Sequence, residues 1–493
     1  MKTLAIYLRK FPWRVAALAL LGLVVVRLRG EKPAPSPPFR VEACEDVSGR
    51  FTGAPRLHSF AWAQWEGKWI FLAGRVGGYH GVGQGEVDFP RSRANLKIWV
   101  VEPSESGPAR VYSFAVADLP AKLAAVKDQW VSTNLLHFQD RDTLYLAGGY
   151  GQNSAGELVT YPILSSVSLP SLVKGVMQGK DTFSGAISWV ESPLVQSTGG
   201  ELVKLDDGFF YLVGGHVFMG AYRAFEAQTE KNSAKARQTY LGEIRKLRVQ
   251  PASPGKLTVS LVERFSDPEF ARRDLNVAPT ILPDGSLGAG VYGGVFTKDQ
   301  LNFTRPIYFS ATSAPAVDRS FEQKMSAYAC AKLLIFDSEA RRMYTTFFGG
   351  ISHWTWNYPA QRFEEAPLVG DKTKEAGYLD GMPWIDHIST LVHGPEGSSE
   401  IVQPGDRLPA YIGTNAAFLP APGLTTIGER GEILDFRQFR GKRILAGYLF
   451  GGIRANQKQF PFTDEAPSYS SGNVPTKASD LILKVYVTAP PAP

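Results

Sequence analysis

The sequence is poor in the residues that build disulfide scaffolds and metal centres. It has two cysteines, Cys44 and Cys330, and seven histidines among 493 residues, and only 20% of its residues are charged. Two cysteines are too few for a disulfide-built scaffold, and neither belongs to a metal-ligand spacing. Because 44% of the residues are hydrophobic, the chain can bury a large core, which excludes disorder as its overall state.

Long apolar runs are also scarce, and the run that stands out is Val15 to Val26. Twelve helical residues cover about 18 Å, against about 30 Å for the hydrocarbon core of a membrane. Arg27 and Arg29 flank this run, and a proline-rich stretch follows it without a small-residue cleavage pattern. We predict a signal peptide or signal-anchor helix in residues 1–30 and a stiff spacer in residues 31–38.

Three alternatives remain open for this N-terminal segment. An uncleaved anchor would hold the rest of the chain outside the cytoplasm at the cell membrane. A cleaved signal would make the protein secreted or periplasmic. A buried or frayed N-terminal helix would leave the protein in the cytosol, although arginines on both sides of the run fit a membrane better.

The positive charge of the chain is confined to this same segment. The formal net charge is +6, and residues 1–32 hold seven basic side chains against Glu31 alone. The remaining residues carry no net charge in sum, so the basic isoelectric point does not indicate a polyanionic partner. We therefore predict contact with a membrane through the N-terminal segment and no nucleic-acid partner.

A hairpin pattern recurs through the rest of the chain. Each copy has an apolar strand, a turn and a second apolar strand that ends at glycine, which allows positive φ and close backbone approach. The copies end at Gly74, Gly149, Gly215, Gly294, Gly350 and Gly452. In the sixth copy, ILDFRQFRGKRILAGYLFGG, we place the turn at Gly441. Further strand-like segments follow the glycines, so we expect four-stranded units.

These repeats predict an all-β fold, a six-bladed β-propeller that fills residues 39–487, with residues 488–493 as a tail. The sixth copy lacks a fourth strand, and the segment FRVEACEDV from Phe39 is expected to pair there and close the ring. This closure places Cys44 on an outer strand and Cys330 beside an inner one, too far apart for a disulfide, so we predict two free thiols. Two stacked β-sandwiches are the rival architecture, but they would not explain six similar hairpins.

The repeats resemble the kelch family of β-propellers, whose repeat has a hairpin that ends in a double glycine. Five endings of the type YLAGG, YLVGG, VYGG, FFGG and LFGG carry this resemblance, and the first copy departs from it with Gly-Arg-Val-Gly-Gly from Gly74. Trp189 matches the family's later tryptophan, which several copies lack. The family includes binding modules and exported enzymes such as sialic acid mutarotases and copper radical oxidases.

The loops that follow the glycines should share one rim, because strand direction alternates within each unit. Function is often carried by such loops on a rigid scaffold. Aromatic and polar side chains on or beside these loops are our candidate ligand-binding residues: Arg75, Tyr79, His80, Tyr150, His216, Tyr222, His353, Trp354, Trp356 and Arg454. Side chains of this kind suit sugars, peptides or a protein surface, although any one of them could simply pack its own loop.

The sequence contains no linear catalytic, phosphate-binding or calcium-binding motif. His80, His216 and His353 could meet at one channel mouth, but no accompanying carboxylate spacing supports a metal, and we expect no metal and no cofactor. Our first hypothesis is an exported, monomeric propeller that binds an unknown protein or glycan through the glycine-loop rim. The alternative is an extracytoplasmic enzyme for a carbohydrate or similar polar substrate that uses these histidines and resembles a sialic acid mutarotase.

Overall fold

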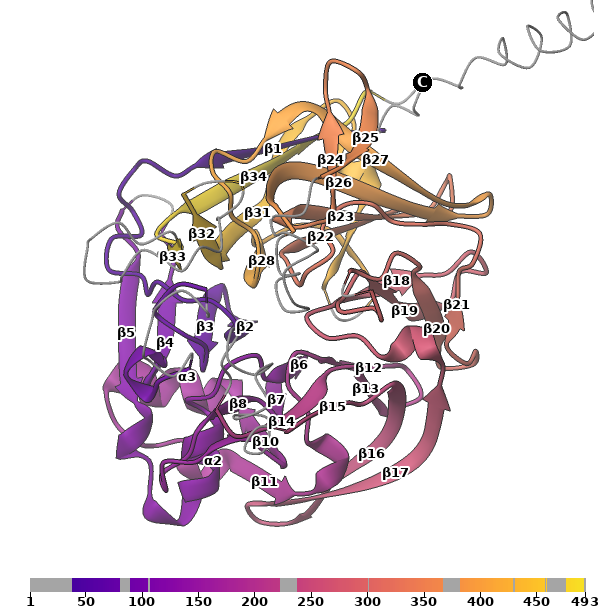
Figure 1. The fold of residues 1–493 in the computed structure, drawn as a ribbon. Helices are drawn as coiled ribbons and strands as arrows, with labels where there is room; N and C mark the ends of the chain where they lie inside the picture. Colours follow the sequence, from indigo (N-terminus) through magenta and orange to yellow (C-terminus); the bar gives the residue numbers. More distant parts are fainter. Residues whose placement is uncertain are drawn as a thin grey trace, which may run out of the picture. The chain divides into compact units, whose positions relative to one another are not determined.

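A computed structural model describes residues 38–79, 89–104, 107–221, 237–299, 301–366, 382–428, 431–456, 458 and 476–491. The described chain is all-β, as predicted, and its sheets are arranged around a common centre (Figure 1). Its α-helices are short, Ala124–Gln129 (α2) and Leu169–Gln178 (α3). The predicted N-terminal helix and, apart from Pro38, the predicted spacer lie outside the described residues.

Most strands belong to antiparallel four-stranded meanders. The first contains β2 (Ala61–Trp65), β3 (Lys68–Leu72), β4 (Lys97–Glu102) and β5 (Arg110–Ala115). The next contains β6 (Leu136–Asp140), β7 (Thr143–Ala147), β10 (Ile163–Ser168) and β11 (Ile187–Glu191). It joins edge to edge with β12 (Glu201–Lys204), β13 (Phe210–Val213), β16 (Glu243–Ser253) and β17 (Lys256–Ser266). This join is a parallel contact between Trp189 and Lys256.

The second half of the chain continues this arrangement. One sheet contains β18 (Asn276–Ile281), β19 (Leu287–Tyr292), β20 (Ile307–Ser310) and β21 (Ala316–Val317). Another contains β22 (Lys332–Asp337), β23 (Arg342–Ile351), β26 (Trp384–Gly394) and β27 (Gly397–Arg407), extended by β30 (Ile433–Asp435) and β29 (Thr426–Ile427). The last contains β28 (Ala416–Pro420), β31 (Arg443–Gly451), β34 (Ile482–Thr488) and β1 (Arg40–Glu45).

Shorter elements lie between these strands. Two-stranded ribbons are β24 (Trp354–Asn357) with β25 (Arg362–Glu365), and β32 (Ile453–Ala455) with β33 (Thr476–Ala478). The loops after Gly149 and Gly215 pair into a further sheet of β8 (Tyr150–Gln152), β9 (Leu158–Thr160), β14 (His216–Met219) and β15 (Arg237–Tyr240). The 3-10 helices are Arg91–Arg93, Val116–Asp118, Ala121–Leu123, Ser184–Ala186, Pro193–Val195, Pro268–Phe270 and Phe436–Phe439.

The N-terminal strand closes the last sheet. Strand β1 pairs antiparallel with β34 from Arg40 opposite Thr488 to Glu45 opposite Leu483. The predicted pairing of the segment from Phe39 with the end of the chain is therefore confirmed. Cys44 lies exposed on β1, whereas Cys330 is buried just before β22, and both are free thiols, as predicted.

A closed ring of backbone hydrogen bonds surrounds the centre of the fold. Each of its residues lies just before the first strand of one four-stranded meander, and its N–H donates to the carbonyl oxygen of the next residue around the ring. The donors and acceptors are Ser59 to Asn415, Asn415 to Ala329, Ala329 to Asp274, Asp274 to Gly199, Gly199 to Asn134 and Asn134 to Ser59, with N···O distances of 2.6 to 3.3 Å. We call these six residues the waist ring.

The glycine pairs close against the segments that lead into this ring. In each pair the second residue donates its N–H to a carbonyl oxygen of the neighbouring segment, for example Gly149 to Ser197 at 2.8 Å. Both residues of a pair have positive φ, 63° and 93° at Gly148 and Gly149. The first copy follows the same rule with Ala73 in place of the first glycine, at φ 57°. Gly74 is therefore the second residue of its pair, so the first copy keeps the backbone arrangement of the other five although its sequence lacks their double glycine.

The sixth hairpin differs from its prediction. The segment Ile433–Asp435 was expected to be its first strand, but as β30 it pairs parallel with β22 of the preceding sheet. The strand that forms the hairpin with β31, and so takes the place expected for β30, is β28. The prediction was wrong because the residues between β28 and β31 cross to the neighbouring sheet before returning, a non-local pairing that a hairpin pattern does not reveal.

Helix α3 was also missed by the sequence analysis. It connects β10 to β11, and its apolar residues Leu172, Val173 and Val176 are buried in one cluster with Ile98 and Phe114 of the preceding sheet. The helix thus fills the space between the outer strands of two adjacent sheets. Its ten residues are too few to produce a long helical periodicity in a β-rich sequence.

We predict that Gly148→Ala will lower the free energy of unfolding by about 3 kcal/mol or more. A Cβ atom there would overlap the carbonyl oxygen of Ser197, in addition to being strained by positive φ. Gly285→Ala is the matched control, because Gly285 also has positive φ, 88°, but no atom lies within 4 Å of the position that a Cβ atom would take there. The control should cost about 1 kcal/mol. Equal losses in urea denaturation would contradict the close-approach explanation.

Candidate functional site

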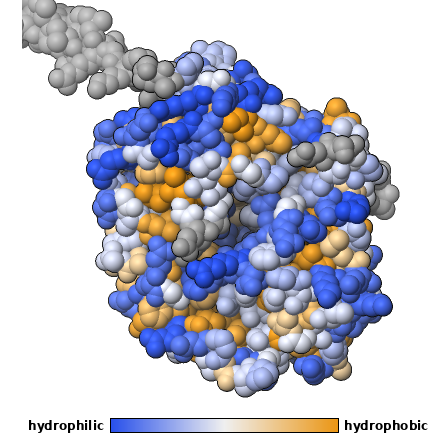
Figure 2. All heavy atoms as spheres, turned by 180° about the vertical axis from the view of Figure 1, so that it is seen from behind, coloured by the Kyte–Doolittle hydropathy of each residue, from blue (hydrophilic) through white to orange (hydrophobic). Residues whose placement is uncertain are grey.

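Two hollows meet at the waist ring. The larger one, the axial cavity, has a volume of about 380 Å³, and the smaller one, the mouth pocket, has about 30 Å³. Both are lined by Ser59, Asn134, Asp274 and Asn415 of the ring. The axial cavity is of the size that holds a small molecule. Figure 2 shows a face of the molecule with a hollow near its centre, rimmed largely by hydrophilic side chains.

The first strand of each four-stranded meander contributes side chains to the axial cavity. Alternate residues of a strand point to the same face, so positions two apart, such as Trp62 and Gln64, line it together. The neighbouring Ala61 and Ala63 are fully buried in the core instead. The lining side chains from the other first strands include His137, Gln139, Glu201, Val203, Val277, Pro279, Lys332, Leu334, Phe418 and Pro420.

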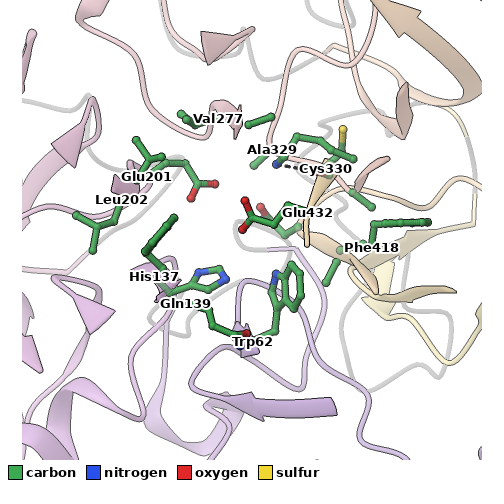
Figure 3. Close-up of a pocket in the computed structure, with 18 of the residues that line it drawn as sticks. Trp62, His137, Gln139, Glu201, Leu202, Val277, Ala329, Cys330, Phe418 and Glu432 are labelled. Carbon is green, nitrogen blue, oxygen red and sulfur yellow. Dashed lines mark hydrogen bonds between the residues drawn. The ribbon is translucent and has the colours of Figure 1, made fainter. Parts of the chain in front are cut away.

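Two carboxyl groups face each other across this cavity. In the close-up of Figure 3, Glu201 and Glu432 extend toward one another from opposite walls, and His137 and Trp62 lie on the wall between them. Glu201 is the first residue of β12. Glu432 precedes β30, so the segment that crosses to β22 also supplies a side chain to the cavity.

Burial controls the charge of these groups. It raises the pKa of Glu201 to about 7, against the opposing influence of the positive Lys332. Burial, assisted by the same lysine, lowers the pKa of His137 to about 4. Lys332 is held at the wall, where its Nζ donates to Cys330 O at 3.2 Å and to Asn276 Oδ1 at 3.3 Å. Near neutral pH, His137 is therefore uncharged, and Glu201 is close to its titration midpoint.

The mouth pocket lies beside residues that directly follow the glycine pairs in the chain, such as Arg75 after Gly74. Arg75 and Arg273 line it and are 5% and 7% exposed. The Arg75 guanidinium lies 4.5 Å from the centre of the Phe89 ring, and that of Arg273 lies 5.0 Å from the centre of the Phe296 ring. These stacks hold both guanidinium groups in the wall of the pocket.

Two threonines with unpartnered hydroxyls are among the residues that line the mouth pocket. The hydroxyls of Thr133 and Thr414 are buried and make no hydrogen bond within the part of the chain that the structure describes. His58 bonds Ser59 Oγ through Nδ1 at 3.0 Å, and backbone hydrogen bonds with Gly77 and Gly78 act to raise the pKa of this imidazole. Burial, together with the nearby Arg75, lowers the pKa of His58 to about 3, so this imidazole is neutral.

The structure brings two of the predicted site residues together. Arg75 and Tyr79 both line the mouth pocket. Tyr150 does not line the mouth pocket but is buried beside it, with its ring centre 5.2 Å from that of Phe89 and its hydroxyl donating to Gly220 O at 2.7 Å. Arg454 forms an ion pair with Asp480 at 2.9 Å. His80 and Tyr222 lie outside the described residues.

The remaining candidates line neither hollow, but His216 adjoins the mouth pocket, where its Nδ1 lies 3.2 Å from Nη1 of Arg273. His216 bonds Gln238 at 2.7 Å through Nδ1, whereas His353 pairs with Glu365 through Nε2. Neither histidine lines the axial cavity or the mouth pocket. Trp354 and Trp356 lie on the β24–β25 ribbon, where Lys324 lies 4.4 Å from the ring centre of Trp354. Within the described residues no group of three or more metal-binding side chains occurs.

Sequence reasoning missed the residues of the axial cavity. Trp62, His137, Glu201, Lys332 and Glu432 lie on or beside strands, whereas the prediction looked only at loops. The available signal was weak: His137 and Lys332 each lie two positions after the start of their copies, at Leu135 and Cys330. We could not interpret it without knowing which face of each first strand points to the axis.

We predict that Glu201→Gln will stabilise the protein at pH 8 by about 1–3 kcal/mol. Because the folded-state pKa of Glu201 is raised to about 7, its ionised form opposes folding above that pH, and the penalty fades as the pH falls toward about 4.5. Urea unfolding at pH 8 and pH 5 would measure both values. The exposed Glu191, replaced by Gln, should change stability by less than about 0.5 kcal/mol at either pH. A loss of stability of equal size at both pH values in Glu201→Gln would contradict this prediction.

Comparisons with known proteins leave the family undetermined. No family model matches the chain, and no curated protein matches it. One similar solved structure is described as "Structure of YjhT", with 12% sequence identity, 89% of this chain and 98% of that chain covered, and a TM-score of 0.45. In the part of the chain that the structure describes, no helix is long and apolar enough to span a membrane.

Proposed function

We propose that the protein is a six-bladed β-propeller of the kelch type, closed by its N-terminal strand. The waist ring supports this count, because each of its six hydrogen bonds links the segments that lead into two four-stranded meanders. The pairing of β1 with β34 supports the closure. The glycine pairs, which the kelch resemblance rests on, occupy equivalent positions against the neighbouring segments.

We propose further that this propeller is a binding module whose ligand is a small polar molecule held in the axial cavity. The observation that carries the proposal is the cavity itself, about 380 Å³ in volume and lined from the first strands of the meanders. Its walls combine the aromatic rings of Trp62 and Phe418 with charged and amide side chains. Apolar walls with a few convergent polar groups are typical of small-molecule sites. The mouth pocket extends the same site toward the predicted glycine-loop rim.

A second candidate function is an enzyme for a carbohydrate or similar polar substrate, as in the resemblance to sialic acid mutarotases. Glu201 favours it, because a carboxyl group with a pKa of about 7 can both donate and accept a proton at neutral pH. Glu432 would be its partner across the cavity. This version replaces the three histidines of the sequence hypothesis, since His216 and His353 line neither hollow. Turnover of a bound substrate that is lost in Glu201→Gln, with binding retained, would favour the enzyme.

The site is proposed to act outside the cytoplasm. The basic, apolar N-terminal segment supports attachment to the cell membrane or, after cleavage, release as a secreted or periplasmic protein. A glycan or a small molecule in that compartment is the expected ligand, and a partner protein is the alternative. We expect the propeller to be monomeric.

We predict that a ligand found by thermal-shift screening of the full chain will depend on Trp62 and not on Trp356. Trp62 lines the axial cavity, whereas Trp356 is on the β24–β25 ribbon. Trp62→Ala should weaken binding at least about tenfold, because the aromatic contact is lost. Trp62→Phe, which keeps an apolar ring, should bind with intermediate affinity and controls for misfolding. Loss of binding in Trp356→Ala alone would move the site to the rim loops and overturn the proposal.

A further inference from the structure

One side of the axial cavity holds three side chains with unused hydrogen-bonding capacity. Trp62 lies on β2, His137 on β6 and Glu201 on β12, the first strands of three successive meanders. Figure 3 shows all three side chains extending into the cavity that they line. In the part of the chain that the structure describes, none of the Trp62 indole N–H, the His137 ring nitrogens and the Glu201 carboxyl group has a hydrogen-bond partner.

The three groups differ in what they can offer to a ligand. An indole N–H only donates, an ionised carboxyl group only accepts, and a neutral imidazole does one at each nitrogen. His137 is neutral because burial lowers its pKa to about 4. Its ring meets that of Trp62 edge to face, with the ring centres 6.2 Å apart. This side of the cavity therefore presents a donor at Trp62, an acceptor at Glu201, and His137 in either role.

Apolar residues form much of the opposite side. In the order of the waist ring, β18, β22 and β28 follow β12, so they lie across the axis from β2, β6 and β12. The residues from these strands that line the cavity and have no polar side-chain atom include Val277, Pro279, Leu334 and Pro420. Figure 3 shows Val277 on the side opposite Trp62. The Lys332 ammonium, also on β22, already donates two hydrogen bonds to the protein.

The glutamine amides of the cavity wall already bond to the protein. Gln64 Nε2 donates to Pro420 O at 3.1 Å, and Gln139 Nε2 donates to Gln64 O at 2.8 Å. Gln139 Oε1 accepts from the backbone N–H of Gln64 at 2.9 Å. These bonds connect β28, β2 and β6 to one another, so the two amides stabilise the wall. Glu432, across the cavity from Glu201, also interacts with other groups of the protein.

We infer that the axial ligand is a ring compound whose hydrogen-bonding groups lie along one edge, an acceptor beside a donor, while the rest of the ring is apolar. The inference rests on the proposed function, because it names the chemistry of the molecule in that cavity. The acceptor receives the Trp62 N–H, and the donor bonds the Glu201 carboxylate. The apolar part of the ring contacts Val277 and its neighbours. Cyclic amides and rings with two adjacent hydroxyls both have such an edge.

Other classes of ligand fit this cavity less well. A molecule that only accepts would leave Glu201 without a partner and shield it from water, and one that only donates would do the same to Trp62. A buried polar group without a partner is costly. A molecule that is polar all round would leave its own groups unpaired against the apolar side. A cation would be repelled by Lys332, whose positive charge already acts on Glu201.

The first test compares two lactams on the full chain. δ-Valerolactam has an N–H donor beside its carbonyl acceptor and is otherwise apolar, whereas N-methyl-δ-valerolactam lacks the donor. Thermal-shift titration should show the first to bind at least about tenfold more tightly, because the second leaves Glu201 unpartnered. Equal affinities, or no binding of δ-valerolactam, would overturn the inference.

Variants then assign the two ends of the edge. Glu201→Met removes the acceptor at similar side-chain volume, so it should bind both lactams equally. Glu191→Met, the same change at an exposed residue, should keep the tenfold preference. Trp62→Phe should weaken both lactams by a similar factor and keep the preference, since both have the carbonyl that accepts from the indole. A preference that survives Glu201→Met would overturn the inference.

A further arm separates the two sources of this edge. The probe is cis-1,2-cyclohexanediol, which has two adjacent hydroxyls on an otherwise apolar ring. Tighter binding of the diol than of δ-valerolactam would assign the ligand to hydroxylated rings, and weaker binding would assign it to cyclic amides. In either case binding of the tighter probe should fall in Glu201→Met.

The outcomes also separate this inference from the proposed function. If Trp62→Ala weakens both lactams but the wild type does not distinguish them, the axial site stands and the one-edged ligand is wrong. If the lactams bind and neither Trp62→Ala nor Glu201→Met changes their affinity, they bind elsewhere, and the axial site loses its support together with the inference.

Discussion

The ring of backbone hydrogen bonds at the waist is the constraint on which the rest of the structure depends. These N–H and C=O groups line the centre of the fold, where each must find a partner, and they find it in the next segment around the axis. Each meander is thereby fixed to two neighbours at the point where its first strand begins. The glycine pairs follow from the same geometry, because they contact carbonyl groups two or three residues before the ring residues. Ala73 adopts the same left-handed backbone conformation, which shows that the first position of each pair requires this conformation more than it requires glycine.

The ring also explains where a ligand can bind. It leaves the axial cavity on one side, lined by side chains that the alternation of the first strands directs toward the axis, and the mouth pocket on the other, lined mostly by residues that lie outside the strands. Several of these side chains oppose stability, since Glu201 is partly desolvated and two threonine hydroxyls are buried without a partner among the described residues. Functional sites commonly keep such unfavourable groups because a ligand satisfies them. The surrounding sheets, with their large apolar clusters, supply the stability that offsets them.

Much of the fold could be predicted from local sequence patterns. Glycine endings and turn residues indicated the hairpins, and the unused segment from Phe39 indicated the closing strand β1. Prediction failed where strand pairing is non-local, as for β30, which pairs with β22 of the neighbouring sheet. It also failed at Ala73, which adopts the positive φ that the pattern expected only of glycine. Of the predicted site residues, Arg75 and Tyr79 line the mouth pocket, but the axial residues Glu201 and Trp62 were missed. Whether these side chains point into the axial cavity depends on which face of each first strand meets the axis. The sequence alone does not specify that face.

The position of a bound ligand in a crystal structure of the complex is the most direct test of the axial site. We expect ligand density on the axis between Glu201 and Glu432. Density confined to the β24–β25 ribbon around Trp356, with both hollows unoccupied, would contradict this expectation.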